Sequence, residues 1–209
     1  MRTTTRDDIT IRTAGGEDVP AIAELLGAAF QDDPRMAALL PDPAHRADKL
    51  GPLFSLLLSQ EHPGHAAELA WRDGRLEAAA VWDRPGGPVT PLARRLYHLP
   101  ALLSIFRWRI PDAVRAIETL NASDSHRPDE PHWHLFAIGT HPQRRGRGVA
   151  GALLASGLDR ADDHDTPVYV ETTAHAGVTH FREHGFRVIH EFPVAGGLTV
   201  YGMWRTPRG

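Results

Sequence analysis

The chain has 209 residues, of which 42% are hydrophobic and 23% are charged. This length and composition predict a single globular domain over residues 1–209 with a sizeable core. The formal net charge of −3 argues against nucleic acid as the main partner. No cysteine is present, which excludes disulfides and thiolate chemistry. The polar first ten residues and the short apolar runs indicate neither a signal peptide nor a membrane span, so we expect a cytoplasmic protein that binds no membrane.

The first third of the chain predicts one strand followed by two amphipathic helices. Residues 9–12 alternate between apolar and polar side chains, which is the period of a half-buried strand. Apolar side chains then recur at helical intervals over residues 19–30, and the run Asp32-Asp33-Pro34 is expected to end that helix. Residues 46–60 repeat the helical pattern as far as His62-Pro63-Gly64.

The middle of the chain predicts a β-hairpin and then a helical insert. Residues 67–71 and 75–82 read as strands and flank an Asp-Gly turn at Asp73-Gly74. The insert, near residues 85–125, is predicted to be mainly helical. The polar residues 121–131 after it predict a loop.

The last third alternates strands and helices. The predicted elements are a strand at 133–140, a helix at 150–158, a strand at 168–172, a short helix ending at 184–186 and two strands around 196–197. Together with the N-terminal elements, this order predicts a mixed α/β fold with a mostly antiparallel central sheet and flanking helices.

The most informative segment is the basic, glycine-rich turn Arg145-Gly146-Arg147-Gly148-Val149-Ala150. It lies between a predicted strand and a predicted helix. A helix N-terminus leaves unpaired N–H groups, and its dipole favours anions. Glycine lets the backbone approach a ligand without interference from a Cβ atom. The segment therefore predicts a phosphate-binding loop.

Two common phosphate-binding motifs fit this loop less well. A P-loop needs Lys-Ser or Lys-Thr, and neither dipeptide occurs in the sequence. The spacing Gly146-x-Gly148-x-x-Gly151 fits a dinucleotide fingerprint, with Glu171 about 20 residues further on. A dinucleotide-binding core would normally open with that motif, however, whereas here it lies about two thirds of the way along the chain.

The spacing Arg145-x-x-Gly148-x-Ala150 instead resembles the (Gln/Arg)-x-x-Gly-x-(Gly/Ala) signature of the GNAT acyltransferase superfamily. The segment His184-Gly185-Phe186 resembles the end of a recurrent Tyr-x-x-x-Gly-Phe segment in that family. The likeness is clear over residues 131–206 and weaker over residues 9–83. Within the superfamily the chain is similar to puromycin N-acetyltransferases. The matching pieces are Arg127–Pro131, Trp133, Val170–Thr172, Phe181–Glu183, Gly185–Phe186 and Met203–Arg205.

The resemblance implies a GNAT fold in which the strand at 133–140 splays away from the strand at 168–172. It also implies acetyl transfer from acetyl-CoA, as co-substrate, to a primary amine of a small molecule, such as an antibiotic or toxin, by direct attack in a ternary complex. The main chain of Ile138, Gly139 and Thr140 would pair with the pantetheine arm. The amides of residues 145–150 would bind the pyrophosphate. No metal is expected.

For several side chains near the glycine-rich turn and the splayed strands, the sequence allows two roles. The arginines at 144, 145 and 147 either reach the phosphates of coenzyme A or are exposed charges. A backbone N–H of Ile138 or Ala137 would polarise the thioester carbonyl. Glu171, in the Glu-Thr position of the family, either orients or deprotonates the amine or is a structural carboxylate.

The sequence departs from the family pattern where a tyrosine often protonates the leaving thiolate. That position is Phe181, and the asparagine often found four residues earlier is Gly177. Either the thiolate leaves unaided, because a thiol with a pKa near 8.5 is a tolerable leaving group, or another group donates the proton. His180 is the adjacent candidate. The others are His175, His184 and Tyr169.

Several alternatives stay open at this point. The missing hydroxyl is also compatible with a catalytically weak protein that binds or senses acyl-CoA. A protein-lysine or peptide acetyltransferase is a further possibility. The pairs His132-x-His134 and His180/His184 have the spacing of metal ligands, although a site needs a third ligand. His134 either shapes a substrate pocket or is a packed strand residue. The oligomeric state is expected to be monomer or homodimer.

Overall fold

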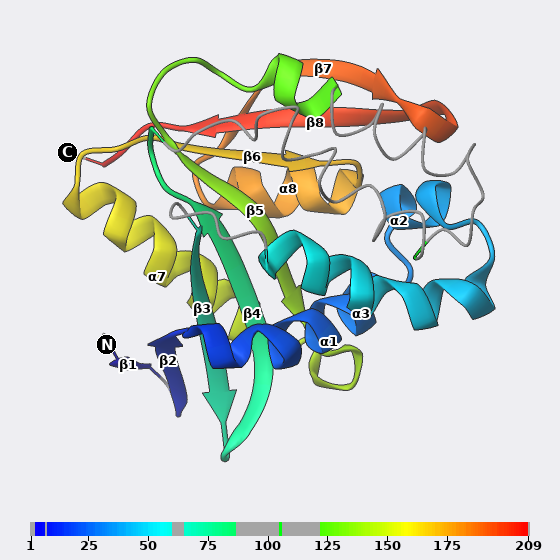
Figure 1. The fold of residues 1–209 in the computed structure, drawn as a ribbon. Helices are drawn as coiled ribbons and strands as arrows, with labels where there is room; N and C mark the ends of the chain where they lie inside the picture. Colours follow the sequence, from blue (N-terminus) through cyan, green and yellow to red (C-terminus); the bar gives the residue numbers. More distant parts are fainter. Residues whose placement is uncertain (1–2, 7, 60–64, 87–104, 106–121, 209) are drawn as a thin grey trace.

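The computed structural model of the chain describes residues 3–6, 8–59, 65–86, 105 and 122–208. Its strands are β1 (Thr3–Arg6), β2 (Ile9–Thr13), β3 (His65–Arg72), β4 (Arg75–Asp83), β5 (Trp133–Thr140), β6 (Val168–Thr172), β7 (Arg187–Val194) and β8 (Leu198–Arg205). Within the described residues these eight strands form one sheet in the order β1-β2-β3-β4-β5-β6-β8-β7 (Figure 1). Only the β5–β6 pair is parallel. The mixed α/β fold with a mostly antiparallel sheet is thereby confirmed.

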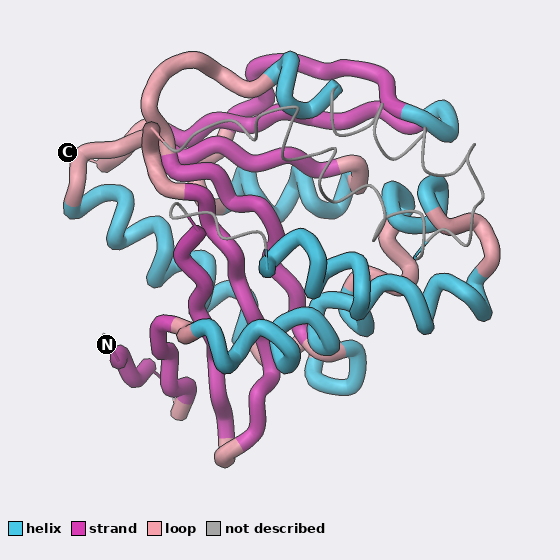
Figure 2. Tube along the Cα trace, in the orientation of Figure 1, coloured by secondary structure: helices cyan, strands magenta, loops and turns pink. Residues whose placement is uncertain are grey.

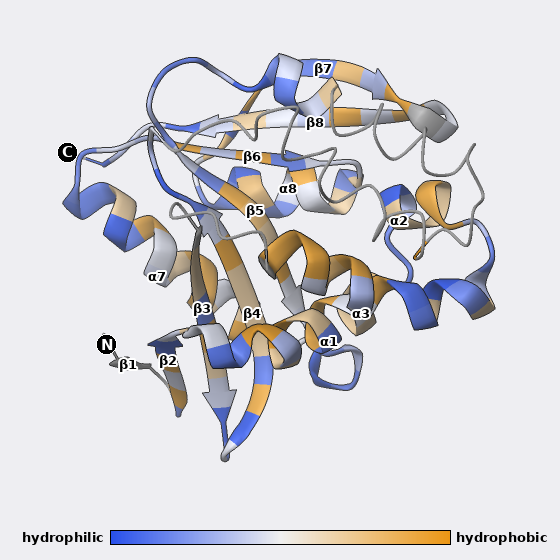
Figure 3. Ribbon diagram, in the orientation of Figure 1, coloured by the Kyte–Doolittle hydropathy of each residue, from blue (hydrophilic) through white to orange (hydrophobic). Residues whose placement is uncertain are grey.

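Helices cover both faces of this sheet. The helical elements are η1 (Gly16–Asp18), α1 (Val19–Ala29), α2 (Pro34–Leu39), α3 (Pro43–Ser59), η2 (Pro142–Arg144), α7 (Val149–Asp163), α8 (His175–Glu183) and η3 (Ala195–Gly197). Helices α1 and α3 pack on one face, whereas α7 and α8 pack on the other (Figures 1 and 2). Apolar residues of α1, α3, α7 and α8 pack in the cores against the sheet, and Figure 3 colours the first half of α3 and parts of α7 as hydrophilic.

Each face of the sheet has its own core. On the α7 and α8 side, the core contains Trp82, Leu153, Val170, Phe181 and Met203, all at most 6% exposed. On the α1 side, a second core is built from other side chains of the same strands. It contains Ile22, Leu26, Phe54, Leu69, Val81 and Ala137. Alternation along β4, with Trp82 in the first core and Val81 in the second, is the two-residue period of a strand that is buried on both faces.

Three parts of the sequence prediction need comment. The run Asp32-Asp33-Pro34 ends α1 but also begins α2, because Asp33 caps that helix by accepting a hydrogen bond from the Met36 amide at 3.0 Å and Pro34 occupies the first turn. The loop expected over 121–131 is wrong at its start, since residues 122–126 are helical. Most of the insert predicted near 85–125, with Trp108, lies outside the described residues.

Two further observations complete the fold. Strand β1, which the alternation pattern did not predict, extends the sheet beyond β2. Among the helices that the structure describes, none is both long and apolar enough to cross a membrane.

Candidate acetyl-CoA and acceptor site

The glycine-rich turn joins β5 to α7 through η2. Gly146 has φ of +78° and Gly148, the N-cap residue of α7, has φ of +76°. A Cβ atom at either position would meet no other atom within 4 Å. The glycines are therefore required by the left-handed backbone and not by crowding. No side chain caps the 15-residue helix α7 at Gly148, and an uncapped helix N-terminus of this kind favours anions.

The arginines of this turn hold it in place. The Nη2 atom of Arg145 donates to the carbonyl oxygen of Ala29 at 2.7 Å, which ties the turn to the end of α1. Arg144 and Arg147 lie 3.9 and 3.7 Å from the Oε1 atom of Glu77, whose side chain is 2% exposed. In this structure the three side chains contact neighbouring elements and brace the turn, and phosphate binding by its backbone stays a prediction.

Strands β5 and β6 separate at a β-bulge. They pair only over Trp133–Leu135, whereas β5 continues along β4 as far as Thr140. The β4–β5 register shifts between Val81 and Trp82, so Phe136 is an extra residue on β5. A bulge bends the strand that carries it, and here it lies where the pairing with β6 stops. The predicted splay of these strands is confirmed, and its cause is this bulge.

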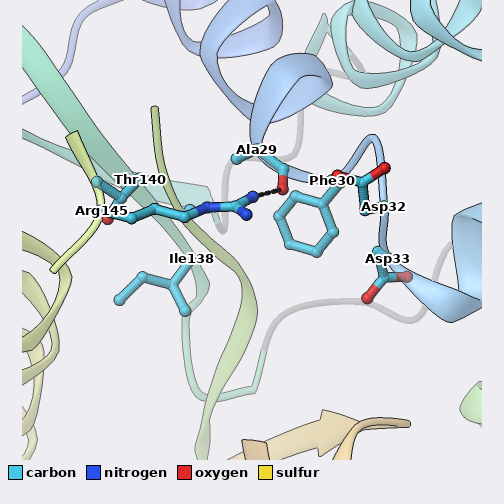
Figure 4. Close-up of a pocket in the computed structure, with 8 residues that line it drawn as sticks. Ala29, Phe30, Asp32, Asp33, Ile138, Thr140 and Arg145 are labelled. Carbon is cyan, nitrogen blue, oxygen red and sulfur yellow. Dashed lines mark hydrogen bonds between the residues drawn. The ribbon is translucent and has the colours of Figure 1, made fainter. Parts of the chain in front are cut away.

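A cavity of about 340 Å³ lies between the splayed part of β5 and the end of α1. Figure 4 shows the side chain of Arg145 spanning toward Ala29, with Phe30 and the two carboxylates of Asp32 and Asp33 beside the cavity. The lining residues are Ala29, Phe30, Asp32, Asp33, Ile138, Gly139, Thr140 and Arg145. Four of these, Ile138 to Thr140 and Arg145, were singled out in the sequence, whereas the acidic pair was noticed only as a helix breaker.

Glu171, near the end of β6, sits in a network of polar side chains. Its side chain is 7% exposed. Its Oε2 atom accepts a hydrogen bond from Ser123 at 2.7 Å and lies 3.4 Å from Nη1 of Arg35, which also contacts Ser123. Its Oε1 atom accepts from the Tyr169 hydroxyl at 3.1 Å. Burial alone would raise the pKa of Glu171, but Arg35 and the Ser123 hydroxyl outweigh burial and hold it below its ordinary value.

Tyr169 and His134 lie on the same face as Glu171. Tyr169 is fully buried, and burial, reinforced by the Glu171 charge, raises its pKa. The hydroxyl also lies 3.1 Å from Nε2 of His190 on β7. His134 is 7% exposed and is held by Arg127 and Asp83, at 2.6 and 2.9 Å from its Nδ1 atom. It is thus a packed strand residue whose ring centroid lies 5.6 Å from that of Tyr169.

Helix α8 carries the departures from the family pattern. Phe181 is 6% exposed and packs edge-on against Phe186, with ring centroids 5.4 Å apart. A Cβ atom at Gly177 would lie 2.4 Å from the Oγ1 atom of Thr172, so the small residue allows α8 to approach β6 closely. The half-exposed His180 contacts its helix neighbours and His184, and burial and His184 lower its pKa. Its suggested catalytic role stays a prediction.

Other sequence-based candidates have local partners. The Nδ1 atom of His132 lies 2.6 Å from the Glu130 carbonyl oxygen, and its ring packs on Tyr169 and Trp204. Within residues 3–6, 8–59, 65–86, 105 and 122–208, no group of three or more histidines, aspartates and glutamates is placed to hold a metal ion. The polar network around Glu171 and Tyr169 also contains Arg35, Ser123 and His190, which the sequence did not predict because no motif marks them.

A sequence model of the acetyltransferase (GNAT) family matches residues 49–186. A crystal structure from Corynebacterium glutamicum, described as histone acetyltransferase HPA2 and related acetyltransferase, superposes with a TM-score of 0.74 at 28% identity over 97% of this chain and 98% of that chain. Drosophila melanogaster polyamine N-acetyltransferase, which forms N-acetylagmatine, has a TM-score of 0.55 at 18% identity over 95% of this chain and 100% of that chain, and shows the fold alone.

A shorter match involves mycothiol acetyltransferase of Acidimicrobium ferrooxidans. It is 36% identical over 76 residues, which are 35% of this chain and only 22% of that protein. These findings do not support the narrower likeness to puromycin N-acetyltransferases. They do show the family, because the GNAT family model matches well over half of the chain, including the glycine-rich turn and the splayed strands. The chain belongs to the GNAT family of acetyltransferases, enzymes that use acetyl-CoA.

Proposed function

We propose that the enzyme acetylates a primary amine of a small, positively charged molecule. The observation that carries this proposal is the cavity that joins the open edge of β5 to Asp32 and Asp33. Burial raises the pKa of Asp33, because a carboxylate is poorly solvated there. A cationic acceptor would add positive charge to that of Arg35, which already acts on the Asp33 carboxylate. The acceptors of the Drosophila relative, a polyamine N-acetyltransferase, belong to this chemical class.

In the proposed complex, acetyl-CoA lies along the splayed strands. The pyrophosphate binds the amides of residues 145–150, and the pantetheine arm pairs with the main chain of Ile138, Gly139 and Thr140. The thioester carbonyl then reaches the cavity, where an N–H of Ile138 or Ala137 stabilises the negative charge that develops on its oxygen. No cysteine is available to form a thioester with the enzyme, so the amine attacks the acetyl group directly.

Glu171 is the proposed partner of the amine. Its lowered pKa keeps it ionised at neutral pH, and an ionised carboxylate orients an ammonium group and takes one of its protons, which frees the nitrogen lone pair to attack. The second proton leaves the nitrogen after the C–N bond has formed and passes to the solvent or to the departing thiolate. The leaving thiolate needs no dedicated acid at this pH, since its thiol is a tolerable leaving group. This matches the buried Phe181 at the position where the family often has tyrosine.

Phe181 also supports one alternative, a protein that binds acyl-CoA and transfers the acetyl group slowly or not at all. The two functions differ in one measurable property, which is release of free CoA that depends on an amine. A panel should contain agmatine, spermidine and puromycin, with a lysine peptide to represent the peptide acceptors. Preference for small cations supports the proposal. Preference for the peptide contradicts the acceptor class, and no release with any amine favours the binding protein.

The loop assignment has its own test. Gly148→Val places a β-branched residue at φ of +76°, where no atom lies near its Cβ. The variant therefore strains the backbone of the turn without a clash against other side chains. We expect acetyl-CoA affinity in isothermal titration to fall about 100-fold or more. Gly86→Val is the matched control, because Gly86 has φ of +70°, equally open surroundings and a place outside the loop. Equal affinities for wild type and Gly148→Val would contradict the loop assignment.

A further inference from the structure

The polar network around Glu171 continues across the sheet. The Tyr169 hydroxyl lies 3.1 Å from the Oε1 atom of Glu171 and 3.1 Å from Nε2 of His190. Tyr169 and Glu171 are on β6, but His190 is on β7, and β8 lies between these strands (Figure 1). The three groups thus form a continuous chain from the buried carboxylate to a partly exposed imidazole on the edge strand.

Gly202 on β8 makes this crossing possible. It pairs with Glu171 on one side and with His190 on the other. A Cβ atom at position 202 would lie 2.1 Å from Nε2 of His190 and 2.8 Å from the Tyr169 hydroxyl. Any side chain there would occupy the space in which the imidazole and the phenol meet. The contact therefore depends on three strands at once.

We propose that Tyr169 and His190 relay the proton of the acceptor amine from Glu171 across β8 to the edge of the sheet. This inference rests on the proposed function, because it requires Glu171 to face the amine. The ammonium N–H bond breaks and an O–H bond forms at Oε1 of Glu171. That proton moves to the Tyr169 oxygen while the Tyr169 proton moves to Nε2 of His190. The resulting imidazolium releases a proton to water, and Tyr169 is neutral before and after.

The charges of the three groups fit their order in the relay. Burial would raise the pKa of Glu171, but Arg35 and Ser123 lower it. A protonated Glu171 therefore gives up its proton readily. Burial raises the pKa of Tyr169, which can pass a proton but does not ionise at neutral pH. Burial and the neighbouring His126 lower the pKa of His190, although the Glu171 charge opposes them. His190 is therefore neutral at pH 7 and able to accept.

The second nitrogen of His190 completes the arrangement. His190 is partly exposed, so that water can reach its ring, and Nδ1 is the ring nitrogen that does not contact Tyr169. His126 lies beside the ring, with centroids 5.8 Å apart. Other titratable or charged groups lie near Glu171 and Tyr169. They are Arg35 on α2, Arg127 after residues 122–126, Asp83 on β4, and His132 and His134 on β5.

The first test removes the terminal acceptor. His190→Ala should lower kcat about tenfold or more and leave acetyl-CoA affinity unchanged, since His190 is distant from the loop in sequence and makes none of its described contacts. In the wild type, kcat should fall as pH drops through the His190 pKa, below 6.5, and this limb should be missing in the variant. Added imidazole should restore turnover.

A purely structural role would not produce imidazole rescue or a changed pH profile. His164→Ala is the matched control, because His164 caps the end of α7 and its Nδ1 atom lies 2.8 Å from the Arg160 carbonyl oxygen. Turnover of His190→Ala within twofold of wild type, or a loss that imidazole does not rescue and that keeps the acid limb, would overturn the relay.

The second test blocks the contact without removing a titrating group. Gly202→Ala should displace His190 from Tyr169 and reduce kcat as much as His190→Ala does. Gly51→Ala is its control, since a Cβ there meets nothing within 4 Å. The double variant should be no slower than His190→Ala alone, whereas additive losses would contradict a shared pathway. No amine-dependent CoA release by the wild type would overturn the proposed function, and active wild type with unchanged variants would overturn the relay alone.

Discussion

Strand β6 presents two largely enclosed faces that are chemically opposite. Val168 and Val170 point toward α7 and α8 and are 0% and 3% exposed. Tyr169 and Glu171 point the other way. Tyr169 is fully buried and the Glu171 side chain is 7% exposed, but their contacts are with the polar residues Arg35, Ser123 and His190. Burial alone therefore does not distinguish the hydrophobic core from the candidate site in this protein. The chemistry of the partners does, because a buried polar group persists only with hydrogen bonds or charges to satisfy it.

This difference predicts that the two faces respond to mutation in different measurements. Glu171→Gln, on the polar face, should lower kcat/KM about 100-fold or more, because the amide retains the shape but cannot accept the amine proton. The free energy of unfolding should change by no more than about 2 kcal/mol, since Arg35 keeps its contact with Ser123. Steady-state kinetics and urea denaturation measure the two effects. A large loss of stability with near-normal kcat/KM would make Glu171 a structural carboxylate.

The apolar face should give the reverse result. Met203 is fully buried on β8, where it pairs with Val170 and Val188. Met203→Ala should lower the free energy of unfolding by about 2–5 kcal/mol, because it removes buried methylene groups and leaves a cavity. Turnover per folded molecule should stay within about twofold of wild type. A drop in turnover as large as that of Glu171→Gln would remove the distinction between the faces.

The smallest effect is expected where the chain departs from its family. Phe181→Tyr restores the hydroxyl at the position where the family often has tyrosine, but Phe181 is nearly buried against Phe186. We expect kcat to change less than about threefold, because a thiolate leaves readily without an acid. Stability should fall by about 1–3 kcal/mol if the buried hydroxyl finds no partner. A tenfold rise in kcat would show instead that protonation of the thiolate limits the wild type.

Much of the fold was predictable because its signals are local. The strand at 133–140, the strand at 168–172 and the turn between residues 145 and 150 follow from alternation, helical periodicity and glycine spacing within a few residues. The run Asp32-Asp33-Pro34 was correctly predicted to end the first helix, but helix α2, which begins at Pro34, was missed because the same residues can end one helix and begin the next.

The partners of Glu171 were not predictable for a different reason. Arg35 and Ser123 lie 136 and 48 residues from it in sequence, and the Tyr169–His190 contact spans 21 residues and a third strand. No local pattern encodes such contacts, since they depend on strand order and register. Gly202 carries a signal only once its neighbours on both sides are known.

The central claim is that the turn at residues 145–150 and the splayed strands bind acetyl-CoA for transfer to a small cationic amine. The most direct measurement is titration of the wild-type protein with acetyl-CoA by calorimetry, followed by release of free CoA against the amine panel. We expect saturable binding of acetyl-CoA and release of CoA that requires an amine and is fastest with small cations. Failure to bind acetyl-CoA would contradict the assignment of this site.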